Sequence, residues 1–216
     1  MARRRHRESA QSDGKGVSRR DFLKGAGFGA AGLAGVKLLE ANLLAAQAGQ
    51  TGGGQIGPGA TPLKLNVNGS LHPLELEPRT TLAEALRDHL GLTGTKVVCD
   101  RGACSACTVW LDGMPVNACM TLAADVGKRQ VTTIEGLAPD GRLHPVQSAF
   151  IEYDAMQCGF CTPGMVMSCA ALLTRNPNPS LDDVKRAVSG NLCRCGTYPK
   201  VFAATLAAAK TGRGHS

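Results

Sequence analysis

The 216-residue chain is 43% hydrophobic and 4% aromatic, a composition typical of a globular protein with one or two domains. Its formal net charge is +7, but residues 1–48 hold nine Lys or Arg and four Asp or Glu, so +5 of this charge lies in that segment. The rest of the chain carries only +2 and no RNA- or DNA-binding motif, so a nucleic-acid partner is not expected.

Residues 1–48 have the order of parts found in an export signal. A basic segment containing Ser18-Arg19-Arg20-Asp21-Phe22-Leu23-Lys24 precedes twelve uncharged residues, 25–36, and then Ala46-Gln47-Ala48 as a small-x-small cleavage site. The paired arginines indicate a twin-arginine signal, which predicts the twin-arginine export machinery as a partner and a periplasmic location. Twelve uncharged residues are fewer than the roughly 20 that cross a bilayer, so no stable membrane span is expected. The alternative is a basic surface arm.

Residues 49–61 are rich in glycine and read as a flexible linker. A first domain is predicted over residues 62–137, and it begins with apolar residues that alternate with polar ones on both sides of Asn68-Gly69. This dipeptide is a strong signal for a hairpin turn. Thr81 and Glu84 have the spacing of a capping box, so a helix is expected from Thr81 to a stop at Gly91.

The remainder of this first domain is again predicted to be mostly strand. Residues 108–111, the turn Asp112-Gly113 and Val116 indicate a second hairpin, and residues 131–134 a last short strand. Hairpin, helix, long loop, hairpin and strand together favour a compact α+β unit.

A second, all-α domain is predicted over residues 143–210, followed by a tail at 211–216. The expected helices cover residues 145–153, 163–175, 180–189 and 199–210. Each half of this domain runs helix, cysteine pair, proline, helix. Such a weak internal repeat is typical of four helices packed about a central site.

Eight of the nine cysteines fall into two groups of four. The first group is Cys99, Cys104, Cys107 and Cys119, with the spacing C-x4-C-x2-C-x11-C. Its first three members have the plant-type ferredoxin spacing for a [2Fe–2S] cluster, which a more distant fourth cysteine completes. Gly102 within this loop lets the chain turn tightly with its amides toward the sulfurs.

The second group consists of two close pairs, Cys158 with Cys161 and Cys193 with Cys195, separated by 31 residues. Each pair is soon followed by a proline, Pro163 or Pro199, which is typical of a loop that leads into a helix. Two such helix starts facing each other would bring four thiolates to one metal centre. Cys169, the ninth cysteine, lies on an apolar helix face and is expected to be a small buried hydrophobe.

These motifs closely resemble the small iron–sulfur subunit of the molybdenum hydroxylases, the xanthine oxidase and aldehyde oxidoreductase family. The resemblance covers about residues 63–210, and its most specific segments are residues 99–109, 157–164 and 190–195. Val98 and Ser105 stand where the family usually has glycine, and Gly196-Thr197 replaces its usual Thr-Gly. All eight thiols of the pattern are present.

The resemblance implies a ferredoxin-like β-grasp domain followed by a four-helix domain, each with one [2Fe–2S] cluster. It implies an electron-transfer subunit that receives electrons one at a time from a molybdenum-pterin subunit oxidising aldehydes or N-heterocycles. The electrons would pass through the second group of cysteines, then the first, to an FAD subunit or a cytochrome. Gln157 matches the glutamine that hydrogen-bonds the pterin in the family, which makes it a candidate cofactor-binding residue.

No catalytic residue is expected on this chain, because the sequence shows no nucleophile–base pair, carboxylate pair or phosphate-binding loop. The alternative of a different class is a zinc-stabilised interaction module without redox function, since four cysteines also hold zinc. Colour separates the two hypotheses, because an iron–sulfur protein is red-brown and a zinc protein is colourless.

Overall fold

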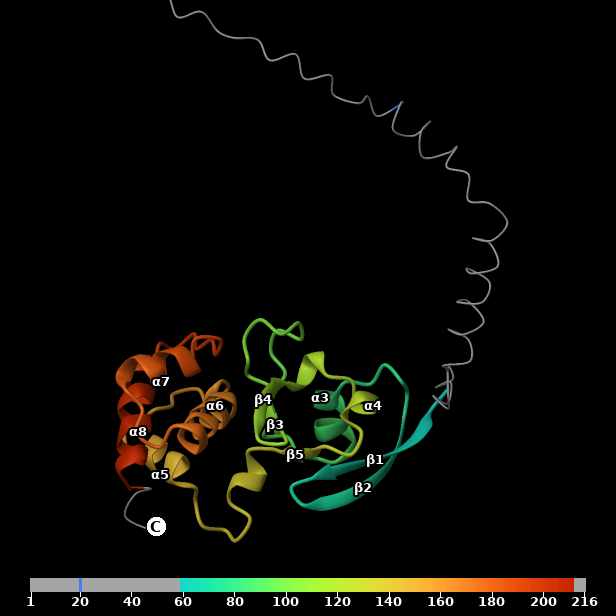
Figure 1. Ribbon diagram of the computed structural model, residues 1–216, viewed down its shortest axis with the longest axis horizontal. Helices are drawn as coiled ribbons and strands as arrows, with labels where there is room; N and C mark the ends of the chain where they lie inside the picture. The colour runs from blue at the N-terminus through green and yellow to red at the C-terminus, as the bar shows by residue number, and fades with distance from the viewer. Residues whose placement is uncertain (1–19, 21–58, 212–216) are drawn as a thin grey trace, which may run out of the picture. The chain divides into compact units, whose positions relative to one another are not determined.

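The computed structural model describes Arg20 and residues 59–211, and residues 59–211 belong to one compact unit (Figure 1). Apart from Arg20, the predicted export signal lies outside the described residues. So do most of the predicted linker and the last residues of the predicted tail. Within the described part of the chain, no helix is both long and apolar enough to cross a bilayer.

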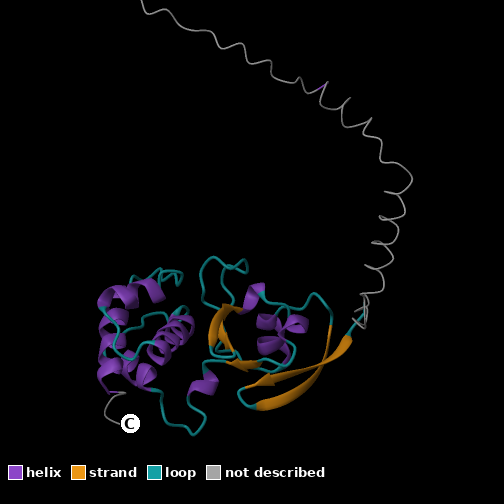
Figure 2. Ribbon diagram, in the orientation of Figure 1, coloured by secondary structure: helices purple, strands orange, loops and turns teal. Residues whose placement is uncertain are grey.

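A five-stranded mixed sheet forms the first half of this unit (Figure 2). Its strand order is β2-β1-β5-β3-β4, with β1 parallel to β5 and the other neighbours antiparallel. The strands are β1 (Thr61–Val67), β2 (Ser70–Leu76), β3 (Thr108–Leu111), β4 (Met114–Asn117) and β5 (Gln130–Thr132).

Both predicted hairpins are confirmed, and both turn on two residues with positive φ. Asn68 and Gly69 have φ of 51° and 80°, and Asp112 and Gly113 have φ of 49° and 78°. Two left-handed residues make a type I′ turn, whose twist matches that of the flanking strands. The turn residues thus place Val67 opposite Ser70 and Leu111 opposite Met114.

The last strand ends earlier than the predicted 131–134. After Thr132 the backbone pairs with a side chain instead of a neighbouring strand: Thr133 donates its N–H to Asn68 Oδ1 at 2.9 Å. The Asn68 amide in turn donates to Thr133 Oγ1 at 3.0 Å. The side chain of Asn68 therefore supplies the hydrogen-bond partner that the Thr133 N–H lacks once the strand has ended.

The predicted capping box at Thr81 is confirmed, with Glu84 N donating to Thr81 Oγ1 and Thr81 N donating to Glu84 Oε2. The helix behind it is α-helical only as α3 (Leu82–Glu84) and continues as a π-helical turn, η1 (Ala85–His89). Such a turn has no sequence signature comparable to a cap. Leu82 and Leu86, which lie four residues apart and share one face, are fully buried.

The sheet packs against α3 and η1 around a core of aliphatic side chains. A 3-10 turn, η2 (Ala118–Met120), and the short helix α4 (Ala123–Val126) cover the rest of this core. Two of the cysteines, Cys107 and Cys119, belong to the same cluster of buried residues as Leu65, Leu86 and Val109. The first group of cysteines is therefore anchored in the core of the sheet domain.

The second half is helical, as predicted, and follows a 3-10 turn, η3 (Glu135–Leu137). Its four helices are α5 (Pro145–Glu152), α6 (Thr162–Arg175), α7 (Leu181–Ala187) and α8 (Tyr198–Thr211). Their core includes Phe150, Met165 and Val201, all buried.

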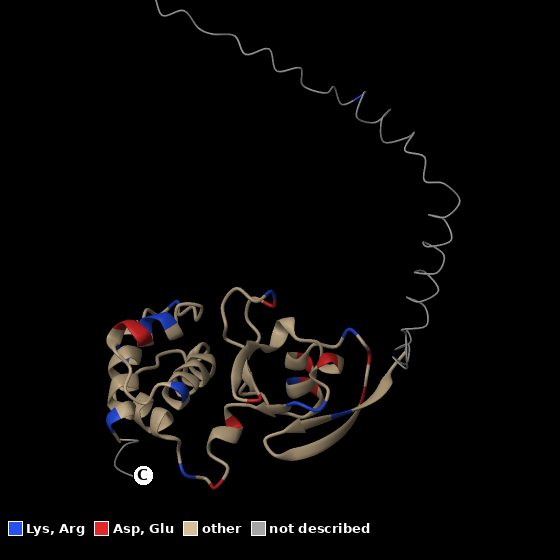
Figure 3. Ribbon diagram, viewed as in Figure 1, with Lys and Arg blue, Asp and Glu red and all other residues tan. Residues whose placement is uncertain are grey.

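Acidic and basic residues occupy different turns of α7 (Figure 3). Ser180 caps this helix in a capping box with Asp183, and the hydrogen bonds from Ser180 lower the pKa of the Asp183 carboxyl. Acidic residues occupy the first turn and basic residues the last, which suits the helix dipole.

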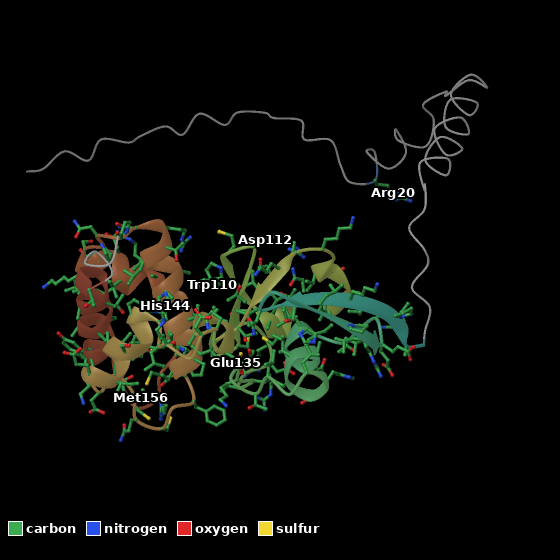
Figure 4. The ribbon with its side chains drawn as sticks, turned by 90° about the horizontal axis from the view of Figure 1, so that it is seen from below. Arg20, Trp110, Asp112, Glu135, His144 and Met156 are labelled. Atoms are coloured by element: carbon green, nitrogen blue, oxygen red, sulfur yellow. The ribbon has the colours of Figure 1, made fainter. Side chains whose placement is uncertain are left out.

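Helix α6 joins the two halves by packing against β3 and β4. Trp110 of β3 lies between the sheet and the helices (Figure 4), and its indole N–H donates to the Met167 carbonyl at 3.0 Å. Gly164, in the first turn of α6, touches the cysteine loop: a Cβ on it would lie 2.3 Å from Ser105 O. These contacts fix the position of the first cysteine loop relative to the start of α6, where one pair of the second group of cysteines lies.

Candidate metal centres

The first cysteine group lies on a loop that coils around its own sulfurs. Gly102 N donates to Cys119 Sγ at 3.4 Å, and Ala103 N donates to Cys99 Sγ at 3.3 Å. Gly102 has φ of 71°, which turns these amides inward as predicted. Backbone N–H groups aimed at sulfur stabilise the charge of thiolate ligands and of the cluster they hold.

The first group is also largely shielded from water. Cys104, Cys107 and Cys119 are buried, and Cys99 is partly exposed at the rim. Burial raises the pKa of the Cys107 thiol to about 12, whereas the Arg101 backbone N–H and then Cys104 lower the pKa of Cys99 to about 7. A bound metal supplies the positive charge that keeps a buried thiol deprotonated.

The second group lies at the starts of two helices, as predicted. Cys161 is the N-cap residue of α6, and Cys195 precedes the first residue of α8, Tyr198, by a short turn. Cys158 and Cys195 are exposed, so this centre is far more open than the first. Helix N-termini carry positive partial charge, which favours the anionic thiolates.

The two partly exposed thiols of this group differ in their surroundings. Burial raises the pKa of Cys161 to about 12. Burial acts on Cys193 in the same direction, but hydrogen bonds from Thr197 outweigh it and lower the pKa of Cys193 to about 7. The Cys193 sulfur lies 3.2 Å from Thr197 Oγ1.

Within the described residues the eight thiols approach one another in pairs. The pairs are Cys99 with Cys104, Cys107 with Cys119, Cys161 with Cys193 and Cys158 with Cys195. In the same part of the chain, no three His, Cys, Asp or Glu side chains surround one position suited to a single metal ion. Each site therefore offers four thiolates, a donor set that a two-iron centre takes over its two irons and that one tetrahedral zinc also takes.

Comparison with known proteins indicates which metal centre these cysteines serve. A model of the 2Fe-2S iron-sulfur cluster binding domain matches residues 65–132, and a model of the [2Fe-2S] binding domain matches residues 133–206. The iron-sulfur-binding subunit of an Escherichia coli aldehyde oxidoreductase is 43% identical over 162 residues, which cover 68% of this chain and 71% of that protein. The small FeS subunit of Eubacterium barkeri nicotinate dehydrogenase is 44% identical, over 66% of this chain and 90% of that protein.

The chain belongs to the family of [2Fe–2S] subunits of molybdenum hydroxylases. Solved structures agree with this assignment. A chain of quinoline 2-oxidoreductase from Pseudomonas putida 86 has a TM-score of 0.69 and 40% identity, over 72% of this chain and 98% of that one. The aldehyde oxidoreductase of Desulfovibrio gigas has a TM-score of 0.68 and 40% identity, but the match covers 18% of that longer chain.

As a member of this family the protein carries two [2Fe–2S] clusters and is the iron–sulfur component of an oxidoreductase, without a substrate site of its own. The alternative of a zinc-stabilised module is set aside, because both matching family models describe 2Fe–2S domains. The α+β domain followed by a helical domain is likewise the arrangement expected from the sequence.

Two further residues named from the sequence, Cys169 and Gln157, lie in opposite environments. Cys169 is fully buried, as predicted; burial raises its pKa to about 12, and Thr205 Oγ1 donates to its sulfur at 3.1 Å. Gln157 is exposed next to Cys158, with its side chain free of hydrogen bonds to the described residues. The ligand roles of the eight cysteines and the role of Gln157 stay predictions.

Sequence reasoning missed three residues that shape the two sites: Gly164, Asn191 and Tyr198. Tyr198 accepts the N–H of Cys193 at 2.9 Å, and its hydroxyl donates to the Asn191 carbonyl at 3.0 Å. Asn191 and Gly164 stand inside the recognised motifs, but nothing in their local sequence indicates that both reach the other cysteine loop.

Proposed function

We propose that this protein relays electrons from a molybdenum-pterin subunit, which oxidises an aldehyde or an N-heterocycle, to a flavin subunit or a cytochrome. The observation that carries the proposal is the contact between the two cysteine loops, where Leu192 N donates to the carbonyl of Cys104 at 3.0 Å. When bound, a [2Fe–2S] cluster supplies one-electron redox chemistry. The names of the relatives, aldehyde oxidoreductase and nicotinate dehydrogenase, support the two substrate classes.

The residues of this chain divide the work between the two sites. The first cluster is held by the first group of cysteines, Cys99, Cys104, Cys107 and Cys119. The second cluster is held by the second group, Cys158, Cys161, Cys193 and Cys195. The amides of Gly102 and Ala103 stabilise negative charge on the first site. The burial of most first-site sulfurs excludes water, whereas the second site stays open toward a partner.

The surface around the second site supports its role as the entry point for electrons. Phe160 and Leu192, each next to or between cysteines of this group, are 55% and 57% exposed. Together with Val98 and Tyr198 they line a groove of about 650 Å³ that runs between the two cysteine loops. Exposed apolar side chains that rim a functional site are typical of a protein interface, and we assign this surface to the molybdenum subunit.

Gln157 is exposed beside Cys158, and we expect its amide to hydrogen-bond the pterin held by the partner. Loss of one neutral hydrogen bond costs about 0.5–1.5 kcal/mol. Gln157→Ala in the assembled complex therefore lowers cofactor retention, or the rate of substrate-driven bleaching of the cluster absorbance, by about twofold to tenfold. Stopped-flow absorbance with substrate and the molybdenum content of the purified complex measure these two quantities.

Gln130→Ala is the matched control, because Gln130 is an exposed glutamine on β5. It is expected to leave both the bleaching rate and the molybdenum content at the wild-type values. If Gln157→Ala behaves like this control, Gln157 has no role toward the pterin. If the wild-type complex is not bleached by an aldehyde or an N-heterocycle, the proposed function itself is wrong.

We further propose that the protein is exported in folded form by the twin-arginine route and works in the periplasm. Ser18-Arg19-Arg20-Asp21-Phe22-Leu23-Lys24 and the uncharged residues 25–36 support this. That route carries folded proteins, so the thiols already hold their clusters when the chain leaves the cytoplasm.

Changing Arg19 and Arg20 together to lysine is expected to stop export while the coloured, folded protein accumulates in the cytoplasm. The charge is unchanged, so the effect isolates recognition of the arginine pair. Fractionation with an immunoblot measures it, and Arg4→Lys with Arg5→Lys is the control of equal charge outside the motif. Export of the Arg19/Arg20 variant at the wild-type level would refute the twin-arginine assignment.

A further inference from the structure

The two cysteine loops meet through two hydrogen bonds. Leu192, which precedes Cys193, donates its N–H to the carbonyl of Cys104 at 3.0 Å. Asn191 donates its side-chain amide to the carbonyl of Ser105, also at 3.0 Å. The first bond therefore links Cys104 of the first group directly to Leu192, the residue before Cys193 of the second group. The second bond lies one residue further along each loop, between Asn191 and Ser105.

Asn191 is held rigidly on the side of the second group. It is 3% exposed, and its backbone carbonyl accepts the Tyr198 hydroxyl at 3.0 Å. The same hydroxyl accepts the N–H of Cys193 at 2.9 Å. Tyr198 thus ties Asn191 and Cys193 into one unit, and the Asn191 amide projects from that unit to the first cysteine loop.

Ser105 is held just as firmly on the other side. It has φ of 52°, a left-handed conformation that is unfavourable for a non-glycine residue and persists only when its surroundings enforce it. Its carbonyl accepts the Thr108 hydroxyl at 2.7 Å as well as the Asn191 amide. Gly164 packs against the same carbonyl and leaves no space for a side chain.

We propose that Asn191 is a positioning residue. Its bond to Ser105 maintains the adjacent hydrogen bond from the Leu192 N–H to the Cys104 carbonyl, and this adjacent bond sets the electronic coupling between the two clusters. The route consists of covalent bonds and one hydrogen bond from Cys193 through Leu192 to Cys104. One electron passes along it, and no bond breaks and no proton moves. Electron transfer slows steeply as the gap between two centres widens, so the hydrogen bond is the step most sensitive to displacement.

This inference rests on the proposed function, and its test begins with Asn191→Ala in the complete complex. Without the amide, the Ser105 carbonyl loses one of its donors and the two loops are free to part. With both clusters reduced, we expect the magnetic splitting between their paramagnetic signals to shrink or disappear. We also expect substrate to reduce the first cluster severalfold more slowly, while the second cluster is reduced at the wild-type rate.

Asn117→Ala is the matched control, because Asn117 makes the same kind of bond without crossing between the loops. Its amide donates to the Gly102 carbonyl at 3.2 Å, within the first cysteine loop. This variant is expected to alter the first cluster's own signal and to keep the splitting. A purely structural role for Asn191 would give the same result for Asn191→Ala, and that outcome would overturn the proposal.

Tyr198→Phe provides a second test that leaves Asn191 in place. It removes the hydroxyl that fixes Asn191 to Cys193, so the splitting is expected to decrease here too. If Asn191→Ala fails to assemble both clusters, the Tyr198→Phe result decides: unchanged splitting and unchanged transfer between clusters refute the proposal. Failure of substrate to reduce either cluster in the wild-type complex would instead refute the proposed function, so the two failures are distinguishable.

Discussion

Gly164→Ala is expected to destabilise the protein by about 3 kcal/mol, because the added methyl group overpacks the contact between α6 and the first cysteine loop. A Cβ at this position lies 2.3 Å from Ser105 O and 3.0 Å from both Ala106 Cα and Ala106 O. All three are backbone atoms, so no flexible side chain can move aside. Alanine in place of glycine favours a helix by up to about 1 kcal/mol, which is too little to offset the clash.

Thermal or urea unfolding of the purified protein measures this loss of stability, and the magnetic splitting between the reduced clusters reports whether the loops have moved apart. Gly59→Ala is the control, because no atom lies within 4 Å of a Cβ there and its φ is not positive. It is expected to change stability by less than about 0.5 kcal/mol. A Gly164→Ala protein as stable as this control would show that the loop and α6 are not in rigid contact.

Cys107→Ala is expected to abolish the first cluster and to leave the second one in place. The substitution removes one of four thiolates from a two-iron centre, and half of the iron is expected to be lost with it. Because Cys107 and Cys119 also belong to the buried core of the sheet domain, that domain loses the binding free energy of the cluster as folding free energy. Iron analysis and the reduced-state paramagnetic spectra of the complex measure the loss.

Cys169→Ala is the matched control, since it deletes a buried sulfur that stands outside both groups. It leaves a small cavity beside Thr205, so we expect a loss of about 1–2 kcal/mol with both cluster signals intact. Two intact signals in Cys107→Ala would show that Cys107 is not a ligand. Loss of a signal in Cys169→Ala would show that the ninth cysteine is one.

The sequence alone was sufficient for the features that depend on neighbouring residues. The turns at Asn68-Gly69 and Asp112-Gly113, the capping box at Thr81 and the proline-led helix α6 follow from preferences that act over a few residues. The spacing of the cysteines indicated two iron–sulfur sites for the same reason, because ligands on one loop must match the size of the centre they hold.

Only the tertiary structure decided how the two sites differ and how they meet. Asn191 and Ser105 are 86 residues apart in the chain, and no local pattern relates them. Gly164 has no room for a Cβ because it faces the backbone of Ser105 and Ala106 in the other half of the protein. The burial of the first group and the exposure of the second arise likewise from packing between distant segments. Local propensity carries no information about such contacts, since they form only when the sheet and the helices dock.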